Sequence, residues 1–143
     1  MGILTDFVIA KDEDAVAISE ATRTADNWPT LESKGVDTIK LSTLYCAATN
    51  TEYENAIQAS FTMVAGDEEE GPWVFKFPSE ILSTIAHIES DSVSSIAKIW
   101  AATEELQMDG WSEDDAAQFI TELVTHAKIT RATGASLFLW MSL

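Results

Sequence analysis

The chain has few basic residues, little proline and a single cysteine. Its 143 residues include 8 Lys or Arg against 24 Asp or Glu, which gives a formal net charge of -16. Nucleic-acid binding relies on Lys and Arg contacts to phosphates, so this composition argues against a nucleic-acid partner. Because Cys46 has no second cysteine to pair with, an internal disulfide and a thiolate metal cluster are excluded. A reducing compartment such as the cytoplasm is the simplest expectation.

Several motifs that signal catalysis or membrane insertion are also absent. The sequence contains no Gly-rich phosphate loop, no GxSxG turn and no HExxH pair, and its two histidines, His87 and His126, stand far apart. We therefore predict no cofactor and no metal site. The longest strongly apolar run, residues 137–141, is far shorter than the roughly 20 residues that a membrane helix needs, so no membrane segment is expected.

The acidic residues extend over the whole chain instead of forming a tail. Residues 1–71 carry a net charge of -10 and residues 72–143 carry -6, while 46% of all residues are hydrophobic. A chain of this length can bury one sizeable core, which predicts a single domain over residues 1–143. Its acidic surface could simply be solvated, which is the plainer interpretation, or it could attract a basic protein partner.

Apolar patterns predict an α+β fold in which helices predominate and pack on a small sheet of two or three strands. The expected strands lie near residues 7–10, 73–77 and 137–141, and the last two are expected to pair. Helices are expected to begin at Asp37, at Pro78, at Asp91 and at Ser112, and the helix after Asp91 is expected to continue through Leu106 to a stop at Asp109-Gly110.

Residues 51–65 fit two conformations. Thr51 and Glu54 have the spacing of a capping box, and apolar residues from Tyr53 to Val64 follow helical spacing. Phe61 to Val64 would fit an extended conformation equally well.

Four stretches together resemble an uncharacterised family of small acidic bacterial proteins. They are MGILTDFVIA (residues 1–10), GPWVFKFP (71–78), WAATEE followed by DGW (100–111) and LFLWMSL (137–143). The order of the parts is also similar to that of the YfbM-like proteins of unknown function. These resemblances imply a bacterial, intracellular α+β domain and imply no reaction or catalytic residue.

The densest group of polar residues near an aromatic side chain is Glu104, Glu105 and Asp109, close to Trp111. Carboxylates in such a setting could act as acid and base, with His126 or His87 as a proton carrier, or could bind a ligand. The simpler interpretation is an exposed helix end capped by Gly110, with His126 in a structural role. The sequence leaves both interpretations open.

Five tryptophans are many for this length. Trp73, Trp100 and Trp140 lie in apolar patterns and are predicted to belong to the core. Trp28, beside Pro29, and Trp111, after Gly110, have polar neighbours and are the candidates for anchoring a partner.

Three functions follow as hypotheses. A non-catalytic interaction module that docks a basic protein through acidic helices and an aromatic anchor needs only features that are present. A small hydrolase-like or ligand-binding protein would need Glu104, Glu105, Asp109 and a histidine to converge. A self-associating structural protein would form a symmetric homodimer through an apolar face.

Overall fold

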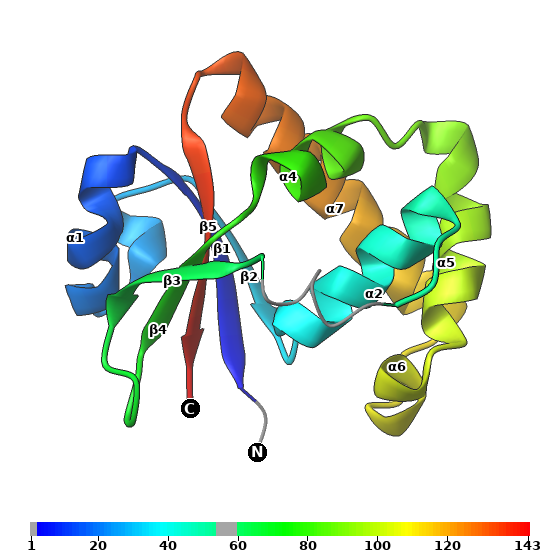
Figure 1. The fold of residues 1–143 in the computed structure, drawn as a ribbon, viewed down its shortest axis with the longest axis horizontal. Helices are drawn as coiled ribbons and strands as arrows, with labels where there is room; N and C mark the ends of the chain where they lie inside the picture. The colour runs from blue at the N-terminus through cyan, green and yellow to red at the C-terminus, as the bar shows by residue number, and fades with distance from the viewer. Residues whose placement is uncertain (1–2, 54–59) are drawn as a thin grey trace.

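The computed structural model describes residues 3–53 and 60–143 and contains one antiparallel sheet with helices on both of its faces (Figure 1). The strand order is β2-β1-β5-β4-β3. The strands are β1 (Leu4–Ala10), β2 (Thr30–Lys34), β3 (Thr62–Gly66), β4 (Trp73–Lys76) and β5 (Ser136–Ser142). The described helices are α1 (Ala15–Glu20), α2 (Thr38–Thr49), α4 (Ser79–Ala86), α5 (Val93–Ala101), α6 (Glu104–Met108) and α7 (Glu113–Ala132). The predicted α+β class is confirmed.

The sheet is larger than the two or three strands predicted. Strands β1, β4 and β5 coincide with the expected segments, and the expected pairing of β4 with β5 is confirmed, with Trp73 opposite Met141. The strand that was missed is β2, whereas β3 was expected only as the extended alternative for Phe61 to Val64, and both strands lie at the edges of the sheet. Edge strands are short and partly solvated, so TLESK in β2 lacks the apolar signal that marked the central strands.

The central strands are covered on both sides. Phe7 and Leu139 face the larger core, beneath α2, α4, α5 and α7, whereas Val8 and Phe138 face a smaller core that includes Ile18 of α1. Figure 1 shows this arrangement, with α1 on one side of the sheet and α2, α4, α5 and α7 on the other. Two covered faces explain why β1 and β5 are nearly continuous apolar runs.

Of the three tryptophans predicted for the core, Trp100 and Trp140 are buried. Trp73 is only half-buried, so that prediction is wrong in part. Its indole N–H donates to the Glu68 carbonyl oxygen at 3.1 Å, in the acidic loop before β4. That loop lies at the edge of the sheet, where fewer neighbours cover the ring.

The helix ends follow the expected caps in two helices. Asp37 caps α2 by accepting a hydrogen bond from the Lys40 N–H at 2.9 Å. Ser112 caps α7 by accepting from the Asp115 N–H at 3.0 Å, and the Asp115 carboxylate accepts from the Ser112 N–H in return.

Three expected helix boundaries are wrong. Pro78 is the extended residue before α4, which begins at Ser79, and Asp91 lies in a 3-10 turn before α5. Helix α5 ends at Ala101 instead of continuing through Leu106. There the Gln107 side-chain amide donates to the Ala101 carbonyl oxygen at 2.7 Å, which occupies an acceptor that a continuing helix would use.

The ambiguous segment is resolved in part. Thr62–Gly66 forms β3 and pairs with β4, so the extended alternative for Phe61 to Val64 is right for residues 62–64 and the helical one is wrong. The remaining part of the expected helix is not helical at Thr51 to Tyr53 or at Phe61, and its residues 54–59 lie outside the described residues. Within the described part of the chain, no helix is long and apolar enough to cross a bilayer.

Candidate functional site

A groove runs between the edge strand β2 and the helix α7 and has a volume of about 380 Å³. Its strand wall is residues 31–34, and the loop 109–111 closes one part of it. Its helix wall consists of Asp115, Gln118, Phe119 and Glu122. These four residues follow the i, i+3, i+4, i+7 spacing and therefore share one face of α7.

An aromatic cluster forms the base of the groove. The ring of Trp111 lies 5.6 Å from that of Trp100 and 5.8 Å from that of Phe119, with edge-to-face geometry at both contacts. Trp100 is fully buried and Phe119 is buried, whereas Trp111 is half-buried and also lines the groove. Aromatic rings in such contacts stabilise one another and present a rigid apolar surface.

The position of Trp111 follows from the end of α6. Its N–H donates to the Leu106 carbonyl oxygen at 3.0 Å, and the Gly110 N–H donates to that of Gln107 at 3.2 Å, which together form a Schellman motif. Gly110 has a φ of +72°, a conformation that glycine adopts at little cost. The predicted stop at Asp109-Gly110 is confirmed, and it turns the chain so that Trp111 packs on the core.

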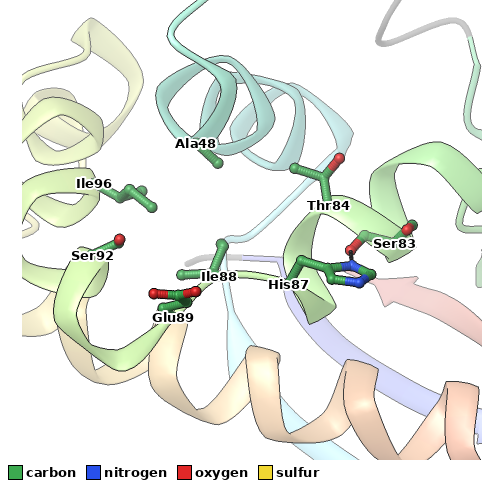
Figure 2. Close-up of a pocket in the computed structure, with 8 residues that line it drawn as sticks. All are labelled: Ala48, Ser83, Thr84, His87, Ile88, Glu89, Ser92 and Ile96. Atoms are coloured by element: carbon green, nitrogen blue, oxygen red, sulfur yellow. Dashed lines mark hydrogen bonds between the residues drawn. The ribbon is translucent and has the colours of Figure 1, made fainter.

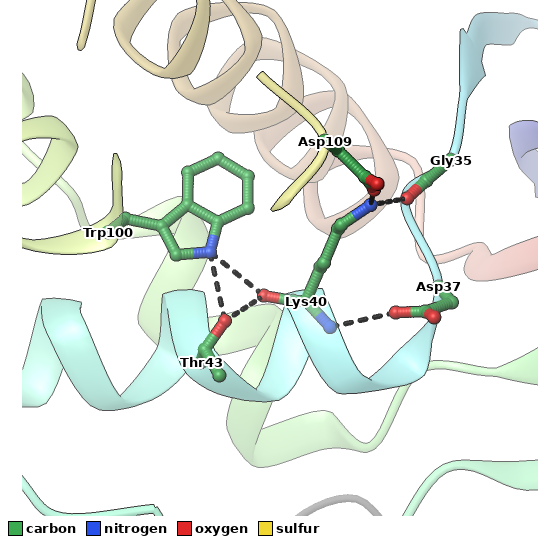
Figure 3. Close-up of polar contacts among 6 residues, drawn as sticks. All are labelled: Gly35, Asp37, Lys40, Thr43, Trp100 and Asp109. Atoms are coloured by element: carbon green, nitrogen blue, oxygen red, sulfur yellow. Dashed lines mark hydrogen bonds and ion pairs between the residues drawn. The ribbon is translucent and has the colours of Figure 1, made fainter. Parts of the chain in front are cut away.

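A buried lysine holds the same loop from the other side (Figure 3). The Lys40 side chain is 6% exposed, and its ammonium group donates to the Asp109 carboxylate and to the Gly35 carbonyl oxygen. The Trp100 indole N–H donates to the Lys40 carbonyl oxygen at 3.0 Å and also contacts the Thr43 hydroxyl at 3.0 Å. These contacts join the start of α2, the end of α6 and the aromatic cluster, and so fix one end of the groove.

Acidic side chains dominate the rim. Four acidic residues line the groove against one lysine, Lys34, and they are Glu32, Asp109, Asp115 and Glu122. Two of their carboxylates already pair with a cation, since Asp109 pairs with Lys40 and Glu32 pairs with Arg23 at 3.4 Å. Hydrogen bonds from the backbone and side chain of Ser112 lower the pKa of Asp115, so this carboxylate stays charged well below neutral pH. The groove therefore has a negative potential above an apolar base.

Only one of the four residues considered for catalysis lines this groove. Asp109 does, but its carboxylate pairs with Lys40. Glu104 and Glu105 lie in α6, where they are exposed and half-buried respectively. Neither is among the residues that line the groove.

His126 is held against the sheet. Its Nε2 lies 2.8 Å from the Phe7 carbonyl oxygen, which can only accept, so Nε2 carries the hydrogen. Burial lowers the pKa of His126, and the carbonyl groups of Phe7 and Pro29 partly offset that effect. The ring is therefore neutral at pH 7 and tethers α7 to β1. Among the described residues, no hydrogen bond or ion pair was found that joins His126 to Glu104, Glu105 or Asp109.

The two candidate anchors differ in position. Trp111 lines the groove, whereas Trp28 is half-buried and packs against the smaller core beyond the sheet. Neither ring protrudes as a free anchor, because each one covers a core. Trp111 can still contact a ligand that lies in the groove.

A second cavity, of about 480 Å³, lies between the ends of α2 and α4 and the start of α5 (Figure 2). It is lined by a histidine, His87, and a carboxylate, Glu89. Figure 2 shows the His87 ring turned toward Ser83, whose carbonyl oxygen lies 2.7 Å from Nδ1, and away from Glu89. The two side chains therefore do not form an acid–base pair.

Over residues 3–53 and 60–143, no group of three or more His, Cys, Asp or Glu side chains is placed to hold a metal ion. The groove itself was not predicted from the sequence. Two of the residues that line it were candidates for other roles, Asp109 for catalysis and Trp111 for anchoring a partner. The available signal was the α7 pattern of Asp115, Gln118 and Glu122 beside the buried Phe119. The strand that faces this pattern could not be recognised.

Comparisons with protein-family models, with curated proteins and with solved structures found no match to this chain. The family resemblances drawn from the sequence therefore stay predictions.

Proposed function

We propose that this protein is a non-catalytic, cytoplasmic interaction module whose groove between β2 and α7 docks a basic segment of a partner protein. The observation that carries this proposal is the composition of the groove. Four acidic residues and one lysine line it over a base that includes Trp111 and Phe119, and the carboxylates of Asp115 and Glu122 form no ion pair within the described part of the chain.

Lysine and arginine side chains suit such a surface on two counts. Their charged heads pair with carboxylates at the rim, and their apolar stems pack on aromatic and aliphatic side chains below. The net charge of -16 adds a long-range attraction that speeds association with a basic partner at low ionic strength.

The other functions have less support in the described residues. A carboxylate enzyme needs an acid and a base near one ligand, and the groove brings Asp109 together with neither histidine. Self-association would bring two strongly acidic surfaces together, which their mutual repulsion opposes.

The proposal can be tested by selecting basic peptides from a displayed library on the purified protein. Binding of the tightest peptide is then measured by fluorescence anisotropy for wild type and for the double variant Glu32→Lys/Glu122→Lys. Both positions are exposed and lie on opposite walls of the groove. The matched control is Glu13→Lys/Glu104→Lys, which changes the net charge equally at two exposed positions that do not line the groove.

We expect the groove variant to lose at least about tenfold in affinity, because each reversal changes an interaction of about 0.5 to 1 kcal/mol in sign at low salt. The control should lose much less, and raising NaCl from about 50 to about 300 mM should reduce the difference. Equal losses in the two variants, or no selected peptide at all, would refute the groove as the docking site.

A further inference from the structure

We infer that the basic segment binds as an added β-strand on the open edge of β2, an inference that rests on the function proposed above. The groove is bounded on one side by four consecutive residues of an edge strand and on the other by a helix face. An extended peptide between an edge strand and a helix gains backbone hydrogen bonds from the strand and side-chain contacts from the helix.

The pattern of hydrogen bonds between β1 and β2 shows which β2 groups point outward. The Ile9 N–H donates to the Pro29 carbonyl oxygen at 3.0 Å, and the Gly35 N–H donates to that of Ile3 at 2.7 Å. Bonded and non-bonded pairs alternate in an antiparallel ladder, so Leu31 and Ser33, opposite Phe7 and Thr5, also bond to β1. The N–H and C=O groups of Thr30, Glu32 and Lys34 therefore point away from the sheet.

These outward groups have no partner among the hydrogen bonds found outside the regular ladder in the described part of the chain. Glu32 and Lys34 are exposed, and residues 32–34 line the groove. The unsatisfied edge is therefore continuous with the acidic groove. A ligand strand would place alternate side chains toward Leu31 and Phe119 and the remaining ones toward the face of the sheet that carries Glu32.

Charge decides between the possible occupants of this edge. In a symmetric antiparallel pairing of two copies centred on Glu32, the two Glu32 side chains would lie directly opposite each other, which is destabilising. The two copies would also repel each other at longer range, because each one carries a net charge of -16. A basic strand from another protein meets the opposite situation. Its side chains on the α7 side face Asp115 and Glu122, and those on the other side face Glu32, which pairs with Arg23 in the free protein.

Amide hydrogen exchange measured by NMR, with the tightest peptide from the library as the probe, tests this inference. Peptide binding should slow exchange of the Thr30, Glu32 and Lys34 amides by about tenfold or more, whereas those of Leu31 and Ser33, already bonded to β1, should change little. Glu32→Pro removes one outward N–H without removing a ladder bond, as edge strands tolerate. We expect it to weaken binding about tenfold more than Glu32→Gln, which removes the charge and keeps the N–H.

If Glu32→Pro loses the native circular dichroism spectrum, peptides N-methylated at alternate positions replace it. One set of methylated positions should abolish binding and the other should leave it intact.

A peptide that binds through the groove charges but leaves the Thr30, Glu32 and Lys34 amides unprotected would overturn strand addition and leave the docking function standing. Failure of every peptide to bind would refute both strand addition and the proposed docking function. Protection of these amides without peptide, increasing with protein concentration, would identify a second copy as the occupant and overturn the inference.

Discussion

Removing Asp109 should destabilise the protein more than removing its partner, Lys40. The reason is the difference in burial, since the Lys40 side chain is 6% exposed and that of Asp109 is 50% exposed. Truncating Asp109 to alanine leaves a buried ammonium group without its counter-charge, and breaking a buried pair in this way costs about 3–5 kcal/mol. Because the carboxylate is half exposed and water can replace part of it, we expect about 2 kcal/mol for Asp109→Ala.

Lys40→Met has a different consequence. Methionine keeps much of the apolar volume of the lysine stem, and the Asp109 carboxylate that remains is solvated. The main loss is the hydrogen bond to the Gly35 carbonyl oxygen, so we expect a cost of about 1 kcal/mol. In the double variant Lys40→Met/Asp109→Ala, the second substitution should add little, because no buried charge remains to be left unpaired.

Urea denaturation near pH 7, followed by tryptophan fluorescence, measures all three variants. Trp100 contacts Lys40 through its indole N–H, so its emission reports on this region. Thermal midpoints should decrease by roughly 3 °C per kcal/mol for a chain of this length. If Lys40→Met costs as much as Asp109→Ala, the proposed asymmetry of burial is wrong.

Three further predictions concern isolated groups. The Thr5 hydroxyl is fully buried and has no hydrogen-bond partner among the residues that the structure describes, so Thr5→Val should raise the free energy of unfolding by about 1 kcal/mol, measured in urea; a decrease would show that the hydroxyl is satisfied. Burial lowers the pKa of His126 in the folded state, so its contribution to stability is complete above the unfolded pKa, about 6.5, and is lost as pH falls through the folded value. The wild type should therefore lose more stability between about pH 7 and pH 5 than His126→Gln does, and parallel pH profiles would contradict this. Burial raises the pKa of Asp6 in the folded state, despite a hydrogen bond from Thr24, so the charged carboxylate opposes folding. The contribution of Asp6 to stability is therefore complete below its unfolded pKa and is lost as pH rises through its higher folded pKa. Asp6→Asn should accordingly be more stable than wild type at pH 7 and lose that advantage near pH 3; a variant that is less stable at pH 7 would show that the Thr24 bond outweighs the cost of burial.

Local features of the sequence predicted the parts of the fold that depend on local chemistry. Asp37 and Ser112 are side-chain caps, and their hydrogen bonds span only three residues, so the sequence contains both partners. Strand β5 was recognisable because both of its faces are buried, which makes Leu137 to Trp140 uniformly apolar. The stop at Gly110 needs only a residue that accepts a positive φ.

The groove could be predicted only in fragments. Asp109 and Trp111 attracted attention by composition and by their loop position, but the sequence suggested a cluster with Glu104 and His126. The structure instead places Asp109 against Lys40, which is 69 residues away along the chain. A short-range pattern contains no information about a partner at that separation.

What the sequence determined by itself is the α+β class, the three inner strands, the caps of α2 and α7 and the sign of the charge, because each follows from composition or from neighbours within a few residues. The tertiary structure alone decided that Thr30–Lys34 forms an edge strand, that α7 lies beside it and that four carboxylates gather over Trp111 and Phe119. The physical reason is that an edge strand is defined by the strand it pairs with on one side and by the absence of a partner on the other. Both are properties of the assembled sheet and not of the five residues themselves.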